Sequence, residues 1–338
     1  MKNYIIAVFI VTFLCLDLRS SFAQPADDSR PNILMIVADD LGYADLGCYG
    51  GEIKTPNIDA LAANGILFTH FHTSPLCAPT RSMLLSGNDN HIAGMGSMFS
   101  VEGTNRAGKP GYEHHLTDRI VTIAQLLKDG GYQTFMSGKW HLGSAKDQIP
   151  YSKGFEKSFA LMNGAANHFN NHPFSPNDTS QYRLDSNIAQ YPAGSFSTDV
   201  YTDKMITYID QRQKGKPFFA YLAYTAPHWP LQVPENYIDR YKGRYEMGYD
   251  SLRTLRFATQ KAAGIVPENA VLRERNPDIR PWTGLSPEEK KSESRKMEIY
   301  AAMVENLDDH IGQLIQFLKK SGLLENTVIV FMSDNGAA

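Results

Sequence analysis

The sequence predicts an α/β fold in which a mostly parallel central sheet is flanked by helices. Continuous apolar runs at 32–38, 217–224 and 327–332 are typical of strands buried on both faces. Segments with helical periodicity alternate with these runs, which favours parallel strands joined by helices. Polar residues follow the strand ends, where such sheets bind ligands.

Composition excludes several other classes of protein. The 338 residues are 42% hydrophobic and include 26 glycines and 18 prolines, which excludes disordered, collagen-like and coiled-coil chains. A net charge of -3 argues against nucleic acid as the main partner. Three cysteines are too few for a disulfide-stapled scaffold.

The first half of the chain contains most of the predicted short elements. Thr55 and Pro56 begin a helix that Gly65 ends, and a short strand is expected at 66–69. A helix around 120–127 ends at Gly130 and Gly131. A strand at 132–137 follows.

The second half is less regular until its end. Segment 144–196 is rich in Asn, Ser and Pro without periodicity, which predicts loops around a site. A helix over 198–213 precedes the strand at 217–224. Segment 240–290 is charged and weakly patterned, as in a surface excursion, and 297–318 predicts one long amphipathic helix.

The N-terminus has the pattern of a secretory signal peptide. Lys2 precedes an apolar run at 5–16, and small residues stand before a cleavage point near Ala23. The run is short for a membrane span, although a retained anchor is the alternative. We therefore expect a signal peptide at 1–23, a catalytic domain at 24–338 and a periplasmic or secreted location.

Export would leave two cysteines, Cys48 and Cys77, and an oxidising compartment makes a disulfide between them one expectation.

The residues around Cys77 also predict a helix that begins there. Pro79 suits a helix first turn and Arg81 lies about one turn after the cysteine. A cysteine at a helix N-terminus beside a cation favours an activated thiolate or an anion-binding turn.

Two acidic clusters follow predicted strands. Asp39 and Asp40 follow the first strand, and Asp334 and Asn335 follow the last. Each cluster alone is compatible with an ordinary turn. Together they offer hard oxygen ligands, which suit Ca²⁺ or Mg²⁺ better than zinc.

Two strand ends carry candidate groups for an anionic substrate. Lys139 and His141 are two residues apart, so they point to the same side of an extended chain. A cation beside an imidazole suits an anionic substrate and a proton transfer, although such a pair also occurs in surface turns. His228 lies between two prolines and is weak evidence alone.

The segment from Cys77 to Gly87 resembles the signature of the type I sulfatases. The matching residues are Cys77-x-Pro79-x-Arg81 followed by Ser82-x-Leu84-x-Ser86-Gly87. The family's other blocks are matched in order by 31–42, 138–143, 226–228 and 333–336. The closest similarity is to bacterial arylsulfatases, through 108–112, 225–232 and 294–310.

The resemblance implies an alkaline-phosphatase-like sulfatase fold and hydrolysis of aryl sulfates or other sulfate esters, sugars included. It implies that a formylglycine-generating enzyme oxidises Cys77, and that the hydrated formylglycine attacks sulfur. Calcium is implied as the cofactor, with magnesium as the lesser candidate. The implied ligands are Asp39, Asp40, the modified Cys77, Asp334 and Asn335.

The remaining roles are also carried over from the family. Arg81 would hold the ionised diol of formylglycine, and Lys139 would neutralise a sulfate oxygen. His141 would take the diol proton in the elimination step, and His228 would protonate the leaving alcohol. The family continues past Ala338 with another substrate-binding lysine, so we expect this chain alone to be inactive or poorly stable.

Two other functions stay open at this point. A phosphodiesterase or phosphonate monoester hydrolase would use the same layout, although Asn335 stands where a di-zinc site would carry histidine. A sulfated-glycan binder without activity is the alternative if Cys77 is unmodified.

Some polar residues are expected outside the site. His114, His115, His168 and His172 are interpreted as solvent-exposed rather than as a second metal site. Asp308 and Asp309 are expected on the solvated side of the long helix.

Overall fold

A computed structural model describes residues 30–173 and 180–337, so the predicted signal peptide at 1–23 lies outside the described residues. The strands are β1 (Asn32–Asp39), β2 (Gln133–Lys139), β3 (Lys157–Leu161), β4 (Tyr182–Leu184), β5 (Asn187–Ala189), β6 (Phe218–Pro227) and β7 (Thr327–Ser333). The α-helices of the described residues are α2 (Pro56–Ala63), α3 (Cys77–Ser86), α4 (Ile123–Asp129), α5 (Ser197–Asp210), α6 (Gly248–Ala262) and α7 (Pro287–Lys320).

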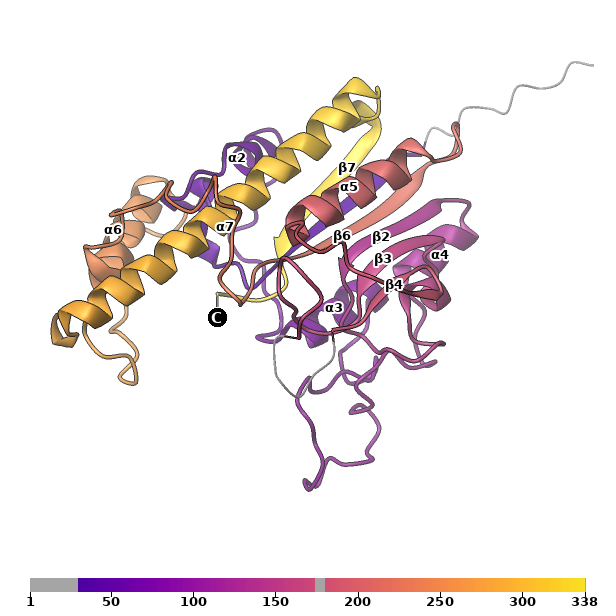
Figure 1. Ribbon diagram of the computed structural model, residues 1–338, viewed down its shortest axis with the longest axis horizontal. Coiled ribbons are helices and arrows are strands. Elements are labelled where there is room, and N and C mark those ends of the chain that lie inside the picture. The colour runs from indigo at the N-terminus through magenta and orange to yellow at the C-terminus, as the bar shows by residue number, and fades with distance from the viewer. Residues whose placement is uncertain (1–29, 174–179, 338) are drawn as a thin grey trace, which may run out of the picture.

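The strands form one sheet in the order β5-β4-β3-β2-β6-β1-β7 (Figure 1). From β3 to β7 all neighbouring pairs are parallel, whereas β4 and β5 add an antiparallel edge. The predicted α/β fold with a mostly parallel sheet is therefore confirmed.

Helices cover both faces of the sheet (Figure 1), which explains why β1 and β6 are apolar along most of their length. On β1, Leu34 and Ile36 belong to the core shared with α5 and α7. Met35 and Val37 point to the other face and pack in the core that includes residues of α3 and α4. All ten residues of β6 are buried between these layers.

Helix α2 begins at Pro56 as predicted, but its N-terminus is capped from another helix. Thr55 makes no side-chain capping bond. Instead, the Asp308 carboxylate of α7 accepts from the backbone N–H groups of Asn57 at 3.1 Å and Ile58 at 2.8 Å. Asp308 is fully buried, so its expected position on the solvated side of the long helix is wrong. The helix dipole and the free N–H groups of α2 explain why a carboxylate is buried there.

Two further expectations need correction, and a third gains detail. Segment 66–69 is not a strand, because no described strand pairs with it, and the Ile66 side chain is 81% exposed. Segment 144–196 is not entirely loops, since it holds β3, β4 and β5, of which the last two are three residues long and too short for a periodic pattern. The surface excursion at 240–290 contains α6, whose Arg256 binds Glu52 and Asp45.

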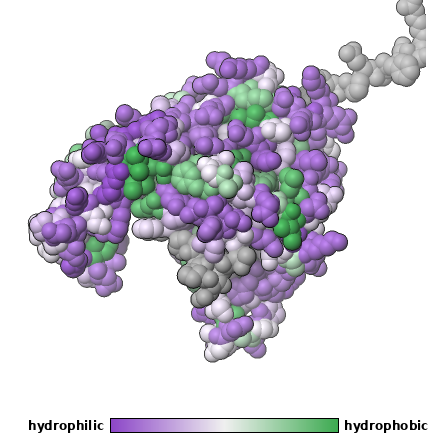
Figure 2. Space-filling model, in the orientation of Figure 1, coloured by the Kyte–Doolittle hydropathy of each residue, from purple (hydrophilic) through white to green (hydrophobic). Residues whose placement is uncertain are grey.

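The surface is mostly hydrophilic. Figure 2 shows a few separate hydrophobic areas on one face, one of them near the middle of α7. Among the residues that the structure describes, no helix combines the length and the apolar character needed to cross a bilayer.

The contact between α7 and α2 yields a stability prediction. Asp308→Ala removes an acceptor shared by two backbone N–H groups and leaves the partly buried Asn57 N–H and the buried Ile58 N–H without this partner. We expect the free energy of unfolding, measured by urea titration, to fall by about 3 kcal/mol. The matched control is Asp309→Ala, because that carboxylate is 38% exposed; its loss should stay under about 1 kcal/mol. Equal losses in the two variants would contradict the capping role.

Candidate active site

Four parallel strands bring their carboxyl ends to one edge of the sheet, as the sequence predicts. Asp39 ends β1 and Lys139 ends β2, with β6 between them. The Lys139 ammonium nevertheless spans that gap and lies 2.8 Å from both carboxylate oxygens of Asp39. His228 follows β6 and Asp334 follows β7.

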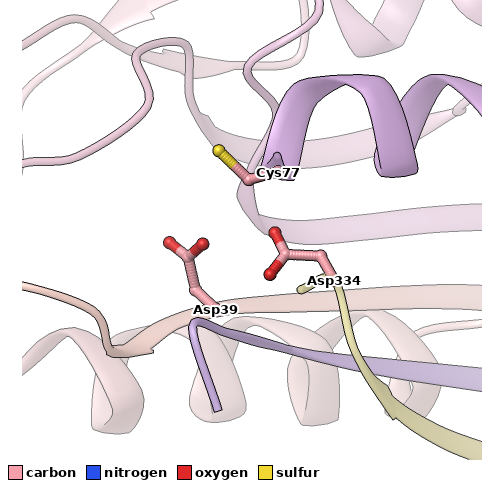
Figure 3. Close-up of side chains that lie close together, drawn as sticks. All are labelled: Asp39, Cys77 and Asp334. Carbon is pink, nitrogen blue, oxygen red and sulfur yellow. The ribbon is translucent and has the colours of Figure 1, made fainter. Parts of the chain in front are cut away.

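Cys77 is the first residue of α3 and faces two of these carboxylates (Figure 3). Its Sγ, one oxygen of Asp39 and one of Asp334 all lie within 4.8 Å of one another. Cys48 and Cys77 are both free, so the structure contains no disulfide between them. Burial raises the pKa of the Cys77 thiol, which is therefore neutral near pH 7.

Arg81 lies one turn further along α3 and completes a buried cluster of four charges. Its Nε donates to Asp334 at 2.8 Å, and its Nη1 donates to the carbonyl of Lys139 at 3.0 Å. Arg81, Lys139, Asp39 and Asp334 each have 0% of their surface exposed. Each cation has a carboxylate partner, as buried charges require.

The cluster sets the pKa values of its members. Burial raises the pKa of Asp39 to about 6, although Lys139 opposes that shift. Burial acts in the same direction on Asp334, but Arg81 outweighs it and lowers the pKa of that carboxyl. Burial would lower the pKa of Lys139, but Asp39 outweighs it and raises that pKa. Both cations therefore stay charged near neutral pH.

The His141 ring lies close to the Cys77 side chain, and two glycines allow the close packing around this part of the site. Its Nδ1 lies 3.4 Å from the Cys77 Sγ, and burial lowers its pKa well below the ordinary value. A Cβ on Gly164 would lie 2.6 Å from the His141 ring, so that position requires glycine. Gly138, with φ of +114°, similarly avoids a Cβ placed 1.8 Å from the Ala223 carbonyl oxygen.

The remaining candidates surround Asp40. The Asn335 Nδ2 donates to Asp40 Oδ1 at 2.5 Å, and the His228 Nε2 lies 3.5 Å from Asp40 Oδ2. The Asp40 N–H lies 3.3 Å from Asp334 Oδ1. The structure thus places Asn335 and His228 next to Asp40, and Asp40 next to Asp334, whereas the ligand atoms that lie within 4.8 Å of one another belong to Asp39, Cys77 and Asp334.

The donor set fits a hard divalent cation. The Oδ1 atom of Asn335 is buried and accepts no hydrogen bond from any described residue, while its Nδ2 is held by Asp40. An amide oxygen in this state is a suitable ligand for a cation. The carboxylates of Asp39 and Asp334 face the same space as Cys77.

A cavity of about 400 Å³ adjoins Cys77, and the sequence patterns did not identify most of its lining. His141 lines it together with Met95, Met98 and Met162. The Met98 Sδ lies 3.7 Å from the Cys77 Sγ. Isolated methionines in irregular segments carry no periodic signal, which is why they were missed.

The histidines that were expected to be exposed divide into three groups. His172 is exposed, as expected, and His114 and His115 are half-buried. His168 is 1% exposed, so the expectation for this residue is wrong. The described residues give one candidate metal group, which contains none of these histidines.

Comparisons with known proteins agree with this site. The chain matches the Sulfatase family over residues 31–338. It is 46% identical to an uncharacterized sulfatase of Schizosaccharomyces pombe over 94% of this chain and 59% of that protein. It is 43% identical to an arylsulfatase of Klebsiella aerogenes over 93% of this chain and 68% of that protein.

Solved structures share the fold. The crystal structure of Ps i-CgsB has a TM-score of 0.66 at 29% identity, covering 91% of this chain and 59% of that one. The chain therefore spans only part of the length of these relatives. The match covers the described sheet and every strand-end residue discussed above, and the chain belongs to the sulfatase family.

Proposed function

We propose that the protein hydrolyses sulfate esters, adding water to release an alcohol and sulfate, with aryl sulfates as the main substrate class. The observation that carries this proposal is the position of Cys77 against Asp39 and Asp334. Arg81 and Lys139, which contact those two carboxylates, add positive charge beside the position of an anionic group. Fixed cations in a buried site stabilise charge that develops on the transferring group.

We infer that a formylglycine-generating enzyme converts Cys77 to formylglycine. The hydrated aldehyde supplies a hydroxyl nucleophile for sulfur, which the neutral thiol of the unmodified residue does not. The first turn of α3 places this position 3.4 Å from His141, which lines the cavity, and fixes Arg81 one turn away.

Calcium is the proposed cofactor, held by Asp39, Asp40, Asp334, Asn335 and the modified residue 77. When bound, the ion supplies Lewis-acid polarisation of the oxygens it contacts. A ligand set of carboxylate and amide oxygens favours calcium or magnesium over zinc.

The charged and imidazole groups of this chain have separate roles in the proposal. Lys139 has three N–H donors, so two bonds to Asp39 leave one for a sulfate oxygen. His141 lies within reach of a proton on the group at position 77. His228 is assigned the proton that the leaving alcohol receives.

The cavity beside Cys77 supports an aromatic leaving group. Met95, Met98 and Met162 offer polarisable thioethers, which make favourable contacts with aromatic rings. A sulfated sugar is the second candidate substrate, because the similar Ps i-CgsB was solved in complex with k-i-k-neocarrahexaose.

One of the two alternatives has structural support. A phosphonate monoester hydrolase of Agrobacterium radiobacter shares the fold with a TM-score of 0.53 at 20% identity, so the fold alone does not separate sulfate from phosphonate chemistry. A non-catalytic sulfated-glycan binder would need Cys77 to stay unmodified.

The N-terminal pattern supports export. We propose that residues 1–23 are removed and that the mature protein is periplasmic or secreted. N-terminal sequencing of protein from its native host would show a start near residue 24, whereas an intact Met1 would contradict export by cleavage.

The first prediction from the proposed chemistry concerns Cys77. In the mature full-length protein, mass spectrometry should find the Cys77 peptide lighter than its unmodified form, because an aldehyde oxygen replaces the thiol. Cys77→Ala should abolish aryl sulfate turnover. Cys48→Ala is the control, since burial raises the pKa of that thiol to about 12 and it lies outside the site. An unmodified thiol, or activity in Cys77→Ala, would refute the nucleophile assignment.

The second prediction separates sulfate from phosphorus chemistry. The wild-type protein should turn over 4-nitrophenyl sulfate with a kcat/KM at least about tenfold above those for 4-nitrophenyl phosphate and a 4-nitrophenyl phosphonate monoester. The same phenol leaves in each case, so the comparison isolates the transferred group. A preference for either phosphorus ester would favour the alternative hydrolase.

The third prediction tests calcium without measuring turnover. In chelator-treated protein, calcium at about one hundred times its Kd should stabilise the fold by about 2.7 kcal/mol, seen as a higher Tm. Asn335→Ala should reduce this shift, because it removes the buried Oδ1. The exposed Asn88, changed to Ala, is the control. Equal shifts in both variants, or none in the wild type, would contradict the metal site.

A further inference from the structure

His168 is buried beside the segment that carries His228, although the proposed chemistry gives it no role. Its Nε2 lies 3.0 Å from the carbonyl oxygen of His228. Its Nδ1 lies 2.7 Å from the Oγ of Ser197, the first residue of α5. The imidazole therefore joins the loop that contains it to two other parts of the fold.

The hydrogen-bond directions select one tautomer of His168. Thr225 in β6 donates to the Ser197 Oγ at 3.2 Å, which leaves the Ser197 hydroxyl proton for the His168 Nδ1. The Nε2 must then carry the ring proton and donate to the carbonyl of His228, which can only accept. Burial lowers the pKa of His168 to about 4, so the ring stays neutral near pH 7.

The backbone of His168 reinforces the same connection. Its N–H donates to the Gln232 side chain at 3.0 Å, and its carbonyl accepts from the Tyr191 hydroxyl at 3.1 Å. His168 thus contacts the chain at His228 and again four residues later. Such a double attachment limits the freedom of the segment between the two points.

We infer that His168 is a positioning residue that fixes the backbone of His228 and thereby aims its imidazole at the oxygen of the leaving alcohol. This inference rests on the proposed function, in which His228 supplies that proton. A general acid is effective only at hydrogen-bonding distance from its acceptor, so a small displacement weakens the proton transfer.

The leaving group provides a readout that a purely structural role would not change. A nitrophenolate departs readily without a proton, whereas an unsubstituted phenolate depends on the acid. His168→Phe keeps a ring against Phe196, whose centroid lies 5.4 Å away, but removes both polar contacts. We expect kcat/KM to fall by less than about threefold for 4-nitrophenyl sulfate and by at least about tenfold for phenyl sulfate.

Two further variants complete the test in the mature full-length protein. His168→Gln should recover phenyl sulfate turnover, because its amide can still donate to the carbonyl of His228. In a His228→Ala background, His168→Phe should change kcat/KM for phenyl sulfate by less than about twofold, since the group it positions is gone.

The outcomes separate the inference from the proposed function. A wild-type protein inactive on both esters would refute the proposed function. If the wild type is active, two results would refute the positioning role alone. One is an equal loss of kcat/KM on both esters in His168→Phe. The other is a loss from His168→Phe on phenyl sulfate that is as large in the His228→Ala background as in the wild type. If His168→Phe does not fold, Ser197→Ala removes the donor to Nδ1 and should give the same selective loss; uniform loss there would overturn the inference.

Discussion

The candidate site depends on a cluster of four fully buried charges, Asp39, Asp334, Arg81 and Lys139. Removing an ion from water costs several kcal/mol even after the protein relaxes, and only close, well-directed partners offset that cost. The pairs Lys139–Asp39 and Arg81–Asp334 provide such contacts. No member is tolerable without its partner, so β1, β2, β7 and α3 must all be in place before any one of these charges can be buried.

The sheet meets this requirement through its order. Strand β6 lies between β1 and β2 and is buried along its whole length, so the two partners of one ion pair come from strands that do not touch. A long side chain is needed to cross β6, and Lys139 spans it to contact Asp39. The preceding residue, Gly138, has no Cβ, which allows β2 to lie against Ala223 of β6. Helices on both faces hold the strand ends rigidly, which suits a site that must orient a charged substrate.

The elements that could be predicted from the sequence are those set by local patterns of residues. Buried strands such as 32–38 and the helix after Pro56 follow from apolar runs and cap residues, and the strand-end polar residues follow from the fold class. Features decided by distant contacts could not be predicted. The buried position of Asp308 depends on helix α2, more than two hundred residues earlier in the chain, and the exposure of Ile66 depends on the absence of a pairing strand among the described residues. Local patterns contain neither kind of information.

The residues proposed for the reaction and those proposed to contact the leaving group lie in different kinds of segment in this fold. The residues that are proposed to handle the sulfate group stand at strand ends and at a helix start, where geometry is nearly fixed by the sheet. The cavity residues Met98 and Gly164 and the positioning residue His168 differ, because all three lie in irregular segments outside the described helices and strands. Such segments can change length and sequence without disturbing the buried charges. Relatives with one chemistry can therefore differ in the ester they cleave, and under the proposed function this protein's own preference would be encoded on the leaving-group side of the site.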